Sequence, residues 1–207
     1  MADQEPQSER FSDEDATPAR KRPRPGERRL QILQTLASML EQPGAERVTT
    51  ASLAAKIGVS EAALYRHFAS KAQMFEGLID FVDQSVIGLI RQVTDREPAG
   101  PVQASRIVAL LLQFAEKNPG MSRVMIGDAL VLEHERLQER INLLFDKIEA
   151  QLRQSLKTSD SPTPTADAQV AASLLVAFMQ GRLQRFARSG FKRLPSEHLQ
   201  AALTKML

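Results

Sequence analysis

One segment of the chain brings hydrogen-bond donors and positive charges together at a spacing suited to contact with nucleic acid. Hydroxyl, guanidinium, imidazole and ammonium groups bind phosphate oxygens, and such contacts set the register of a protein on a duplex without reading its sequence. We expect this role for Thr49, Thr50, Tyr65, Arg66, His67 and Lys71. Ser60, Glu61 and Ala62 come between these donors and have the chemistry to meet base edges.

Glu61 has two interpretations. Its carboxylate can accept a hydrogen bond from the amino group of a cytosine in the major groove. A carboxylate also suits the first turn of any helix, because the helix dipole favours negative charge there. Ala62, the next residue, can contact a thymine methyl group.

Short helices with clear boundaries must position these groups. Thr49 and Thr50 supply an N-cap for a helix over 51–57, and Gly58 follows where that helix must end and the backbone must turn. A second helix is expected over 61–67. Two helices joined by a three- to four-residue turn that contains glycine form the geometry that presents a recognition helix to the DNA major groove. The remaining signals are Val59 as a core residue under the turn, Ser60 and Ser70 as N-caps, Leu64 and Phe68 as core residues, and Lys71 in the first turn of a further helix.

The pattern A-x-x-I-G-V-S-x-x-A-L-Y-R-H-F-x-S-K, which ends at Lys71, resembles the TetR family of dimeric helical DNA-binding proteins. The resemblance covers about residues 30–80, and the turn, the recognition helix and the Ser-Lys that follows all agree in spacing. It implies that Tyr65 and Lys71 contact the DNA backbone, as the Tyr and Lys of this pattern do in the family. It also implies dimers that pair through their last two long helices, and hence a palindromic site.

Helical periodicity predicts an all-α protein, and the absence of cysteine suits the reducing cytoplasm. Periodicity of 3.6 residues recurs along most of the 207 residues, whereas strand patterns are hard to find. The chain has no cysteine, so disulfides, thiolate metal sites and cysteine nucleophiles are excluded. No apolar run approaches the roughly 20 residues of a membrane span, and the N-terminus carries no signal-peptide pattern. We therefore expect a soluble, cytoplasmic protein.

Charge is divided sharply near the N-terminus although the net charge is only +2. Residues 1–19 carry six acids against Arg10, and residues 20–29 carry six cations against Glu27. Prolines and Gly26 accompany these charges, so a disordered tail is expected over 1–26. Two interpretations stand for its basic part: contact with phosphates or a minor groove, or a solvated linker. The acidic part can screen the basic part and weaken non-specific binding.

The charge division, the helix-turn-helix segment and the resemblance to the TetR family together divide the chain into three expected regions. They are the tail over 1–26, a helix-turn-helix domain over 27–72, and a helical dimerisation and partner-binding domain over 73–207. Alanines mixed with large apolar residues over 166–189 suit close helix packing, either in a dimer interface or in a monomer core. Outside the recognition segment we expect helices over 27–41, from Lys71 past residue 90, over 102–117, over 122–132, from there to 157, over 166–189 and over 195–203. Leu30 is expected among the core residues of the first of these. Asn118-Pro119-Gly120 ends the helix over 102–117, the helix to 157 is long and amphipathic, and a polar loop precedes the helix over 166–189.

Catalysis finds no support in the residue pattern, and no metal or cofactor is implied. The histidines His67, His134 and His198 lie far apart and show no acid-base or metal-ligand spacing. Phosphate-binding glycine loops and nucleophile elbows are also missing. The acids and cations at Glu133, Glu135, Arg136, Glu139 and Arg140 are interpreted as a charged helix face.

A closer resemblance extends from Arg29 almost to the end of the chain, to the nucleoid occlusion factors within the TetR family. It is carried by VTTASLAAKIGVSEAALYRHF, IVALLLQFAEKNPGMSRV, DALVLEHERLQERINLLFDKIEAQLRQ and FARSGFKRLP. These factors bind palindromic chromosomal sites and, when bound, antagonise polymerisation of the division protein FtsZ. The alternative is the common TetR arrangement, a repressor whose helical core admits a small ligand.

The same resemblance implies an FtsZ-binding surface that includes Phe81, Leu110, Lys117 and Asn118. Ordinary core packing is the other interpretation of Phe81 and Leu110. A basic Lys117 suits an acidic, extended peptide. The chain departs from the family pattern by having Leu89 in place of an arginine and Gln113 in place of a glycine, which puts the details of this surface in doubt.

Overall fold

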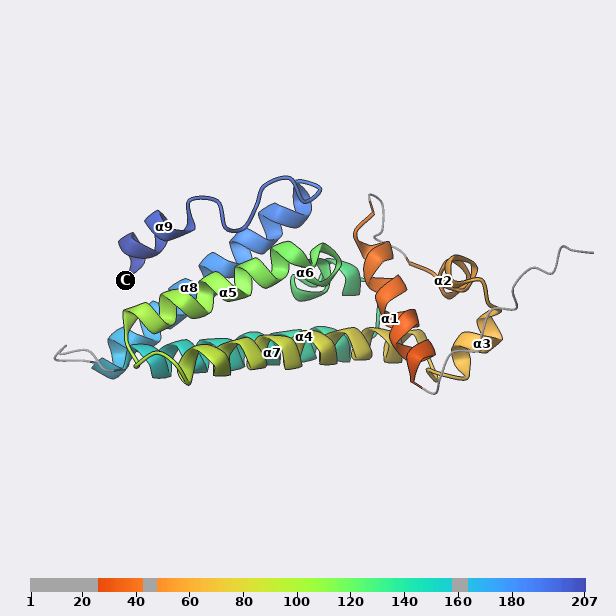
Figure 1. The fold of residues 1–207 in the computed structure, drawn as a ribbon, viewed down its shortest axis with the longest axis horizontal. Helices are drawn as coiled ribbons and strands as arrows, with labels where there is room; N and C mark the ends of the chain where they lie inside the picture. The colour runs from red at the N-terminus through yellow and green to blue at the C-terminus, as the bar shows by residue number, and fades with distance from the viewer. Residues whose placement is uncertain (1–25, 43–47, 158–163) are drawn as a thin grey trace, which may run out of the picture.

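The computed structural model describes residues 26–42, 48–157 and 164–207, which form α-helices and one 3-10 helix with no strand among them. The all-α prediction is therefore confirmed. The molecule is elongated, with a small head at one end and a longer bundle of helices at the other (Figure 1). The tail predicted over 1–26 lies outside the described residues except for Gly26, as do Pro43-Gly44 and most of the polar loop after Lys157.

Three helices build the head: α1 (Glu27–Leu40), α2 (Thr50–Ile57) and α3 (Glu61–Tyr65). Thr49 and Ser52 form a reciprocal capping box at the start of α2, each side chain accepting from the other residue's backbone N–H at 3.1 Å. Gly58 ends α2 in the left-handed region, at φ 76° and ψ 43°. The turn and both caps are as the sequence predicts, although α3 ends two residues earlier than expected.

The head is held by a small apolar core, since each of its helices buries one face. Leu64 and Phe68 are buried as predicted, and Val59 packs against the core under the turn. Leu30, by contrast, is exposed, so its prediction as a core residue is wrong; α1 buries the face that carries Ile32, Leu36 and Leu40.

Helix α4 (Lys71–Thr94) joins the head to the rest of the molecule. Ser70 caps it by accepting from the backbone N–H of Gln73 at 3.2 Å. Its 24 residues span roughly 36 Å at the usual rise per residue. One face is buried along this whole length, through Met74, Phe75, Leu78, Ile79, Val82, Val86, Ile90 and Val93. No break separates the part of α4 beside the head from the part in the bundle.

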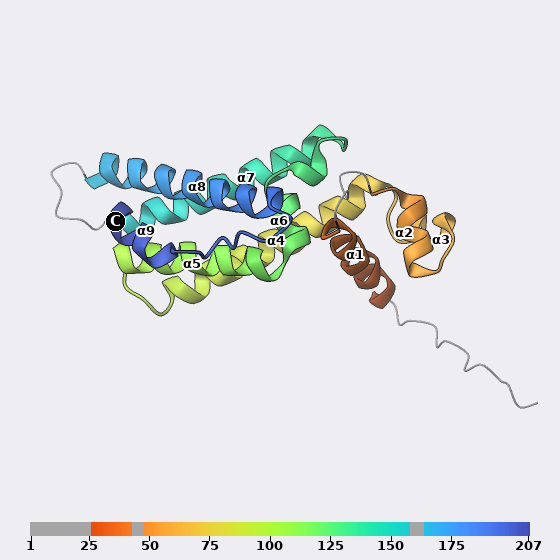
Figure 2. The same cartoon turned by 90° about the horizontal axis from the view of Figure 1, so that it is seen from above.

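The bundle has two layers. α5 (Pro101–Lys117) lies with α4 along one side, and α7 (Glu135–Leu156) lies with α8 (Pro164–Arg188) along the other (Figure 2). The short α9 (Leu199–Met206) ends the chain. The helix α6 (Pro119–Met125) packs against α1, so the head touches the bundle at a second place besides α4.

Two expected helix starts are wrong, for different reasons. Pro119 was expected to break the chain before a helix over 122–132, but it occupies the first turn of α6, where a proline needs no N–H partner. The segment after α6 turns at Gly127 (φ 82°) into a 3-10 helix, η2 (Asp128–Leu130). The last helix begins at Leu199 because Ser196, expected as its N-cap region, donates instead to Glu116 Oε2 of α5 at 2.6 Å.

Replacing Gly120 with Ala tests the contact between head and bundle. A Cβ at this buried position would lie 2.1 Å from the backbone oxygen of Ala37 in α1, so the two helices must separate. We expect the free energy of unfolding, measured by urea denaturation, to fall by about 2 kcal/mol. Gly88→Ala is the matched control, because nothing lies within 4 Å of its Cβ and alanine favours the helix. Equal midpoints for the two variants would contradict the contact.

Candidate nucleic-acid interface

The start of α3 is exposed and fixed by its own cap. Ser60 Oγ accepts from the backbone N–H of Ala63 at 3.3 Å. Glu61 and Ala62 follow on the exposed side of the first turn, while Leu64 is fully buried. The first turn of α3 thus presents two of the three predicted base-reading side chains to solvent on a helix whose other face is anchored in the head.

Thr50 and Glu61 are brought together by the turn between α2 and α3. The Thr50 hydroxyl donates to Glu61 Oε2 at 2.7 Å, and Oε1 takes part in no hydrogen bond among the described residues. A hydroxyl has one proton, so Thr50 cannot donate to a phosphate while it holds this bond. The contact orients the Glu61 carboxylate and leaves one oxygen for a donor outside the protein, which is the geometry needed to accept from a base amino group.

The residues expected to contact phosphate differ in whether their side chains are exposed or already bonded within the protein. Thr49 is committed to the capping box of α2. Tyr65 is 46% exposed although it lies next to buried Leu64, and Arg66 and His67 are also exposed. Tyr65, Arg66 and His67 therefore form an exposed group at the end of α3 that is available to a phosphate backbone.

Arg29 has a role that the sequence does not reveal. Its guanidinium lies 4.2 Å from the centroid of the Phe68 ring and donates to the backbone oxygen of His67 at 3.0 Å. Arg29 was counted with the basic segment 20–29, but in the structure it ties α1 to the chain just after α3. The other cations of that segment, apart from Arg28, lie outside the described residues.

Lys71 is paired within the protein. Its ammonium forms an ion pair with Glu133, in the turn before α7, and lies 5.7 Å from the centroid of the Phe75 ring. The Lys71 side chain is 27% exposed and that of Glu133 only 11%. The residue predicted to contact the DNA backbone therefore also contacts the bundle.

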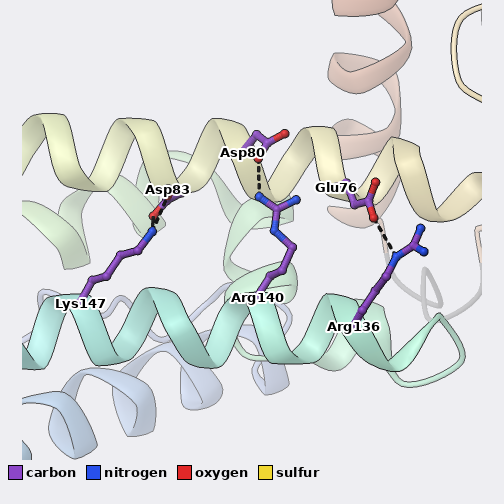
Figure 3. A network of polar contacts seen from close by, with 6 residues as sticks. All are labelled: Glu76, Asp80, Asp83, Arg136, Arg140 and Lys147. Atoms are coloured by element: carbon purple, nitrogen blue, oxygen red, sulfur yellow. Dashed lines mark hydrogen bonds and ion pairs between the residues drawn. The ribbon is translucent and has the colours of Figure 1, made fainter.

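The charged face at the start of α7 also makes tertiary contacts, because Glu133, Arg136 and Arg140 form ion pairs with α4. Besides the Lys71–Glu133 pair, three ion pairs join α4 to α7 and form a row along the two helices (Figure 3). They are Glu76–Arg136 at 2.8 Å, Asp80–Arg140, and Asp83–Lys147 at 3.0 Å. The four-residue spacing of Glu76 and Asp80 on α4 matches that of Arg136 and Arg140 on α7, and this match was the sequence signal for the first two pairs.

The four residues expected to bind a protein partner lie on α4, on α5 and at the end of α5. Phe81 is 46% exposed, so it is not a core residue, whereas Leu110 packs partly buried against the core. Lys117 is exposed, and Asn118 donates to the backbone oxygen of Phe114 at 2.7 Å. Helices α4 and α5 pack side by side, but no hydrogen bond or ion pair joins these four residues to one another among those described.

Large apolar side chains are exposed on α8. Val170 and Leu174 lie one helical turn apart there, although α8 packs closely on α7, and Leu143 is exposed on α7. Ala168, Ala172 and Leu175, on the other face of α8, are buried. The alanine-rich pattern of α8 therefore serves the core, and the large exposed residues beside it form a separate surface.

The described part of the chain contains no group of three or more acids, histidines or cysteines that could hold a metal ion. His134 accepts from the backbone N–H of Arg136 at 3.3 Å and thereby caps α7. Among the described helices, none is both long and apolar enough to cross a membrane.

Comparison with known proteins finds a family model that matches the head and another that matches the bundle. The model for bacterial regulatory proteins of the tetR family matches residues 32–78, and a model for an SlmA-like, tetracyclin repressor-like C-terminal domain matches residues 101–206. The nucleoid occlusion factor SlmA of Idiomarina loihiensis is 49% identical over 177 residues, which are 84% of this chain and 90% of that protein. The SlmA of Shewanella oneidensis is 50% identical over 174 residues, with 83% and 88% covered.

Solved structures agree on the fold. The fatty acid degradation regulator FadR of Bacillus halodurans has a TM-score of 0.70 at 15% identity, covering 88% of this chain and 95% of its own. The TetR-family regulator PfmR of Thermus thermophilus has a TM-score of 0.65 at 19% identity, covering 86% and 94%. At these identities the likeness concerns the helical architecture alone.

Tyr65→Ala tests the exposed end of α3. Since Tyr65 is half-exposed and outside the head core, its removal should leave the fold intact while removing one backbone contact. We expect affinity for duplex DNA to fall by about fivefold to tenfold, to a similar degree on different sequences. Fluorescence anisotropy with two unrelated duplexes measures this. A loss confined to one duplex would contradict a backbone role and indicate base reading.

Proposed function

Since the chain belongs to the TetR family of bacterial regulatory proteins and, within it, to the SlmA nucleoid occlusion factors, we propose that it binds palindromic DNA as a homodimer and, once bound, antagonises FtsZ polymerisation over the nucleoid. It has the fold of DNA-binding regulators and not that of an enzyme. In this proposal residues 27–72 contact DNA, and residues 73–207 pair the subunits and bind FtsZ.

The observation that carries the proposal is that similarity to SlmA continues through the bundle. A helix-turn-helix head is shared by regulators with many different roles, so the head alone does not distinguish them. The SlmA-like model spans residues 101–206, and the Idiomarina loihiensis SlmA keeps 49% identity over most of this chain. Because function in this family differs through the part that follows the head, this continuity favours septum inhibition over ligand-responsive repression.

For DNA, the proposal assigns base reading to the first turn of α3, and backbone contact to the end of α3 and to Lys71 at the start of α4. Glu61, held by Thr50, keeps one carboxylate oxygen for a base amino group. Ala62 is exposed beside it, and Tyr65 to His67 lie next along the chain. Two such heads related by a two-fold axis fit half-sites about one helical turn apart.

For pairing, the proposal uses α7 and α8 and starts from the exposed apolar residues of α8. Val170 and Leu174 are left in water one helical turn apart, which indicates a covered surface, and a two-fold contact buries the same face on both subunits. This is the pair of long helices through which members of the TetR family associate.

For FtsZ, the proposal uses the exposed side of α4 and α5. Phe81 offers an apolar ring to solvent, and Lys117 offers a cation that takes part in no ion pair among the described residues. An extended acidic peptide with apolar residues complements that combination. Gln113, which replaces a glycine of the family pattern, is exposed one helical turn before Lys117, so the surface here differs in detail.

DNA dependence follows from the way the head is attached. In the free dimer the two heads can move relative to each other, and a palindrome selects the arrangement in which both fit. Each α4 carries that arrangement into the bundle, where Phe81 lies on the same helix as Lys71. Several dimers on neighbouring sites raise the local concentration of FtsZ-binding surfaces.

Leu174→Glu tests the pairing surface. A carboxylate in an apolar two-fold interface is buried without a partner once on each subunit, so we expect the dimer to dissociate in size-exclusion chromatography with light scattering. Val102→Glu is the control, because Val102 is an exposed apolar residue that belongs to α5 and not to the proposed interface helices. If both variants remain dimers, the interface lies elsewhere.

Sedimentation of FtsZ under GTP tests the function. With a palindromic duplex that the protein selects from a random pool, we expect loss of sedimented polymer, and with a scrambled duplex much less. No loss with either duplex, once DNA binding is demonstrated, would return the chain to the ligand-responsive repressors.

Lys117→Glu tests the partner surface in the same assay. Reversing the charge should reduce FtsZ antagonism severalfold and leave affinity for the palindrome unchanged, because Lys117 is exposed and forms no hydrogen bond or ion pair with the head among the described residues. Lys205→Glu, an exposed reversal on α9, is the matched control and should behave as the wild type. Equal loss in both variants would contradict a specific role for Lys117.

A further inference from the structure

The Lys71–Glu133 ion pair lies where the head meets the bundle. Lys71 is the first residue of α4, directly after the N-cap Ser70, and Glu133 lies between η2 and α7. The contact therefore connects residues 62 positions apart in the sequence. Lys71 is also the residue to which the proposed function assigns a DNA phosphate, and the inference below rests on that assignment.

The pair differs from the other three ion pairs between α4 and the α7 region. In those three the acid belongs to α4 and the cation to α7, so none of them engages a cation of the helix that begins at the head. At Lys71 the cation belongs to α4 and faces an acid of the bundle. Glu133 thus occupies the place on this ammonium that an anion of the DNA backbone would take.

Sharing the ammonium between both anions is unfavourable. A phosphate that contacts Lys71 would lie close to the Glu133 carboxylate, and like charges at that separation repel. The Glu133 side chain is also mostly shielded from water, so little solvent reaches it to weaken the repulsion. One anion must therefore leave when the other binds.

We propose that Glu133 is an internal competitor for DNA phosphate, which holds Lys71 in the free protein and is displaced from it when DNA binds. The ion pair then has two consequences. It lowers the affinity of the head for any duplex, because each subunit must break it. It also reports DNA occupancy to the bundle, because a shielded carboxylate that loses its cation must turn toward water.

The response is confined to a short segment. The Glu76–Arg136 pair and buried Leu137 hold the start of α7 in place, and buried Leu130 anchors the other end. Between these anchors, Val131 and Leu132 are largely exposed. Residues 131–133 can therefore rearrange while His134 keeps its cap on α7.

Affinity measurements test the competition. With a mixed-sequence duplex at fixed salt, Glu133→Gln should bind about twofold to fivefold more tightly than the wild type, as expected for the loss of one partly exposed ion pair. Glu135→Gln removes the same charge two residues away, from an exposed acid that forms no ion pair among the described residues, and should give a smaller gain.

A double-mutant cycle separates competition from general electrostatics. In a Lys71→Ala background, Glu133→Gln should give no more gain than Glu135→Gln, because no ammonium remains to be released. Equal gains for Glu133→Gln with and without Lys71 would overturn the proposal. So would a Glu133→Gln affinity equal to that of Glu135→Gln. Failure of the wild type to bind any duplex would instead overturn the DNA-binding function itself.

A fluorescence reporter tests the structural response. The chain has no tryptophan, so Leu132→Trp places a single indole beside Glu133 on an exposed position. At saturating duplex DNA, we expect the indole emission to shift in the Leu132→Trp protein that retains Lys71. The protein that carries both Leu132→Trp and Lys71→Ala should show no shift. An equal shift in both proteins, or a shift in neither, would overturn the link between phosphate contact and the turn.

Discussion

The burial of one unbroken face of α4 is the constraint on which the rest of the structure depends. Eight apolar side chains of this helix are buried between Met74 and Val93, first against the head and then against the bundle. Each such side chain contributes about 1.5–3 kcal/mol, whereas a partly exposed ion pair contributes about 0–1 kcal/mol. The apolar face therefore supplies the stability, and the row of ion pairs with α7 fixes the register between the two helices.

This division of roles suits a protein that must convert DNA binding into a change elsewhere. A helix held by apolar burial moves as a unit, so the position of the head is transmitted along it with little loss. The single ion pair of opposite polarity, Lys71–Glu133, lies at the end of the helix that faces the head. The contact of α6 with α1 supplies a second connection, through the close approach of Gly120 to Ala37. The head is thus joined to the bundle at two places and not through a flexible linker.

Local chemistry explains what the sequence predicts well. The caps at Thr49, Ser60 and Ser70 and the turn at Gly58 depend on residues within a few positions, so they are legible without a structure. Tertiary contacts explain what it predicts badly. The Ser196 hydroxyl donates a hydrogen bond to Glu116 of α5, and the last helix starts later than expected. The charged face of α7 forms ion pairs with α4. Of the candidate site, the grouping of residues around α3 could be predicted, whereas the engagement of Thr50 and Lys71 within the protein could not.

The most direct test of the account is the distance between the two heads with and without DNA. Because the chain has no cysteine, Lys56→Cys on exposed α2 gives one spin label per subunit, and double electron-electron resonance measures their separation. The account predicts a broad distance distribution in the free dimer that becomes one narrow peak with a palindromic duplex. A distribution that is equally narrow in both states, or equally broad, would contradict the claim that DNA fixes the heads.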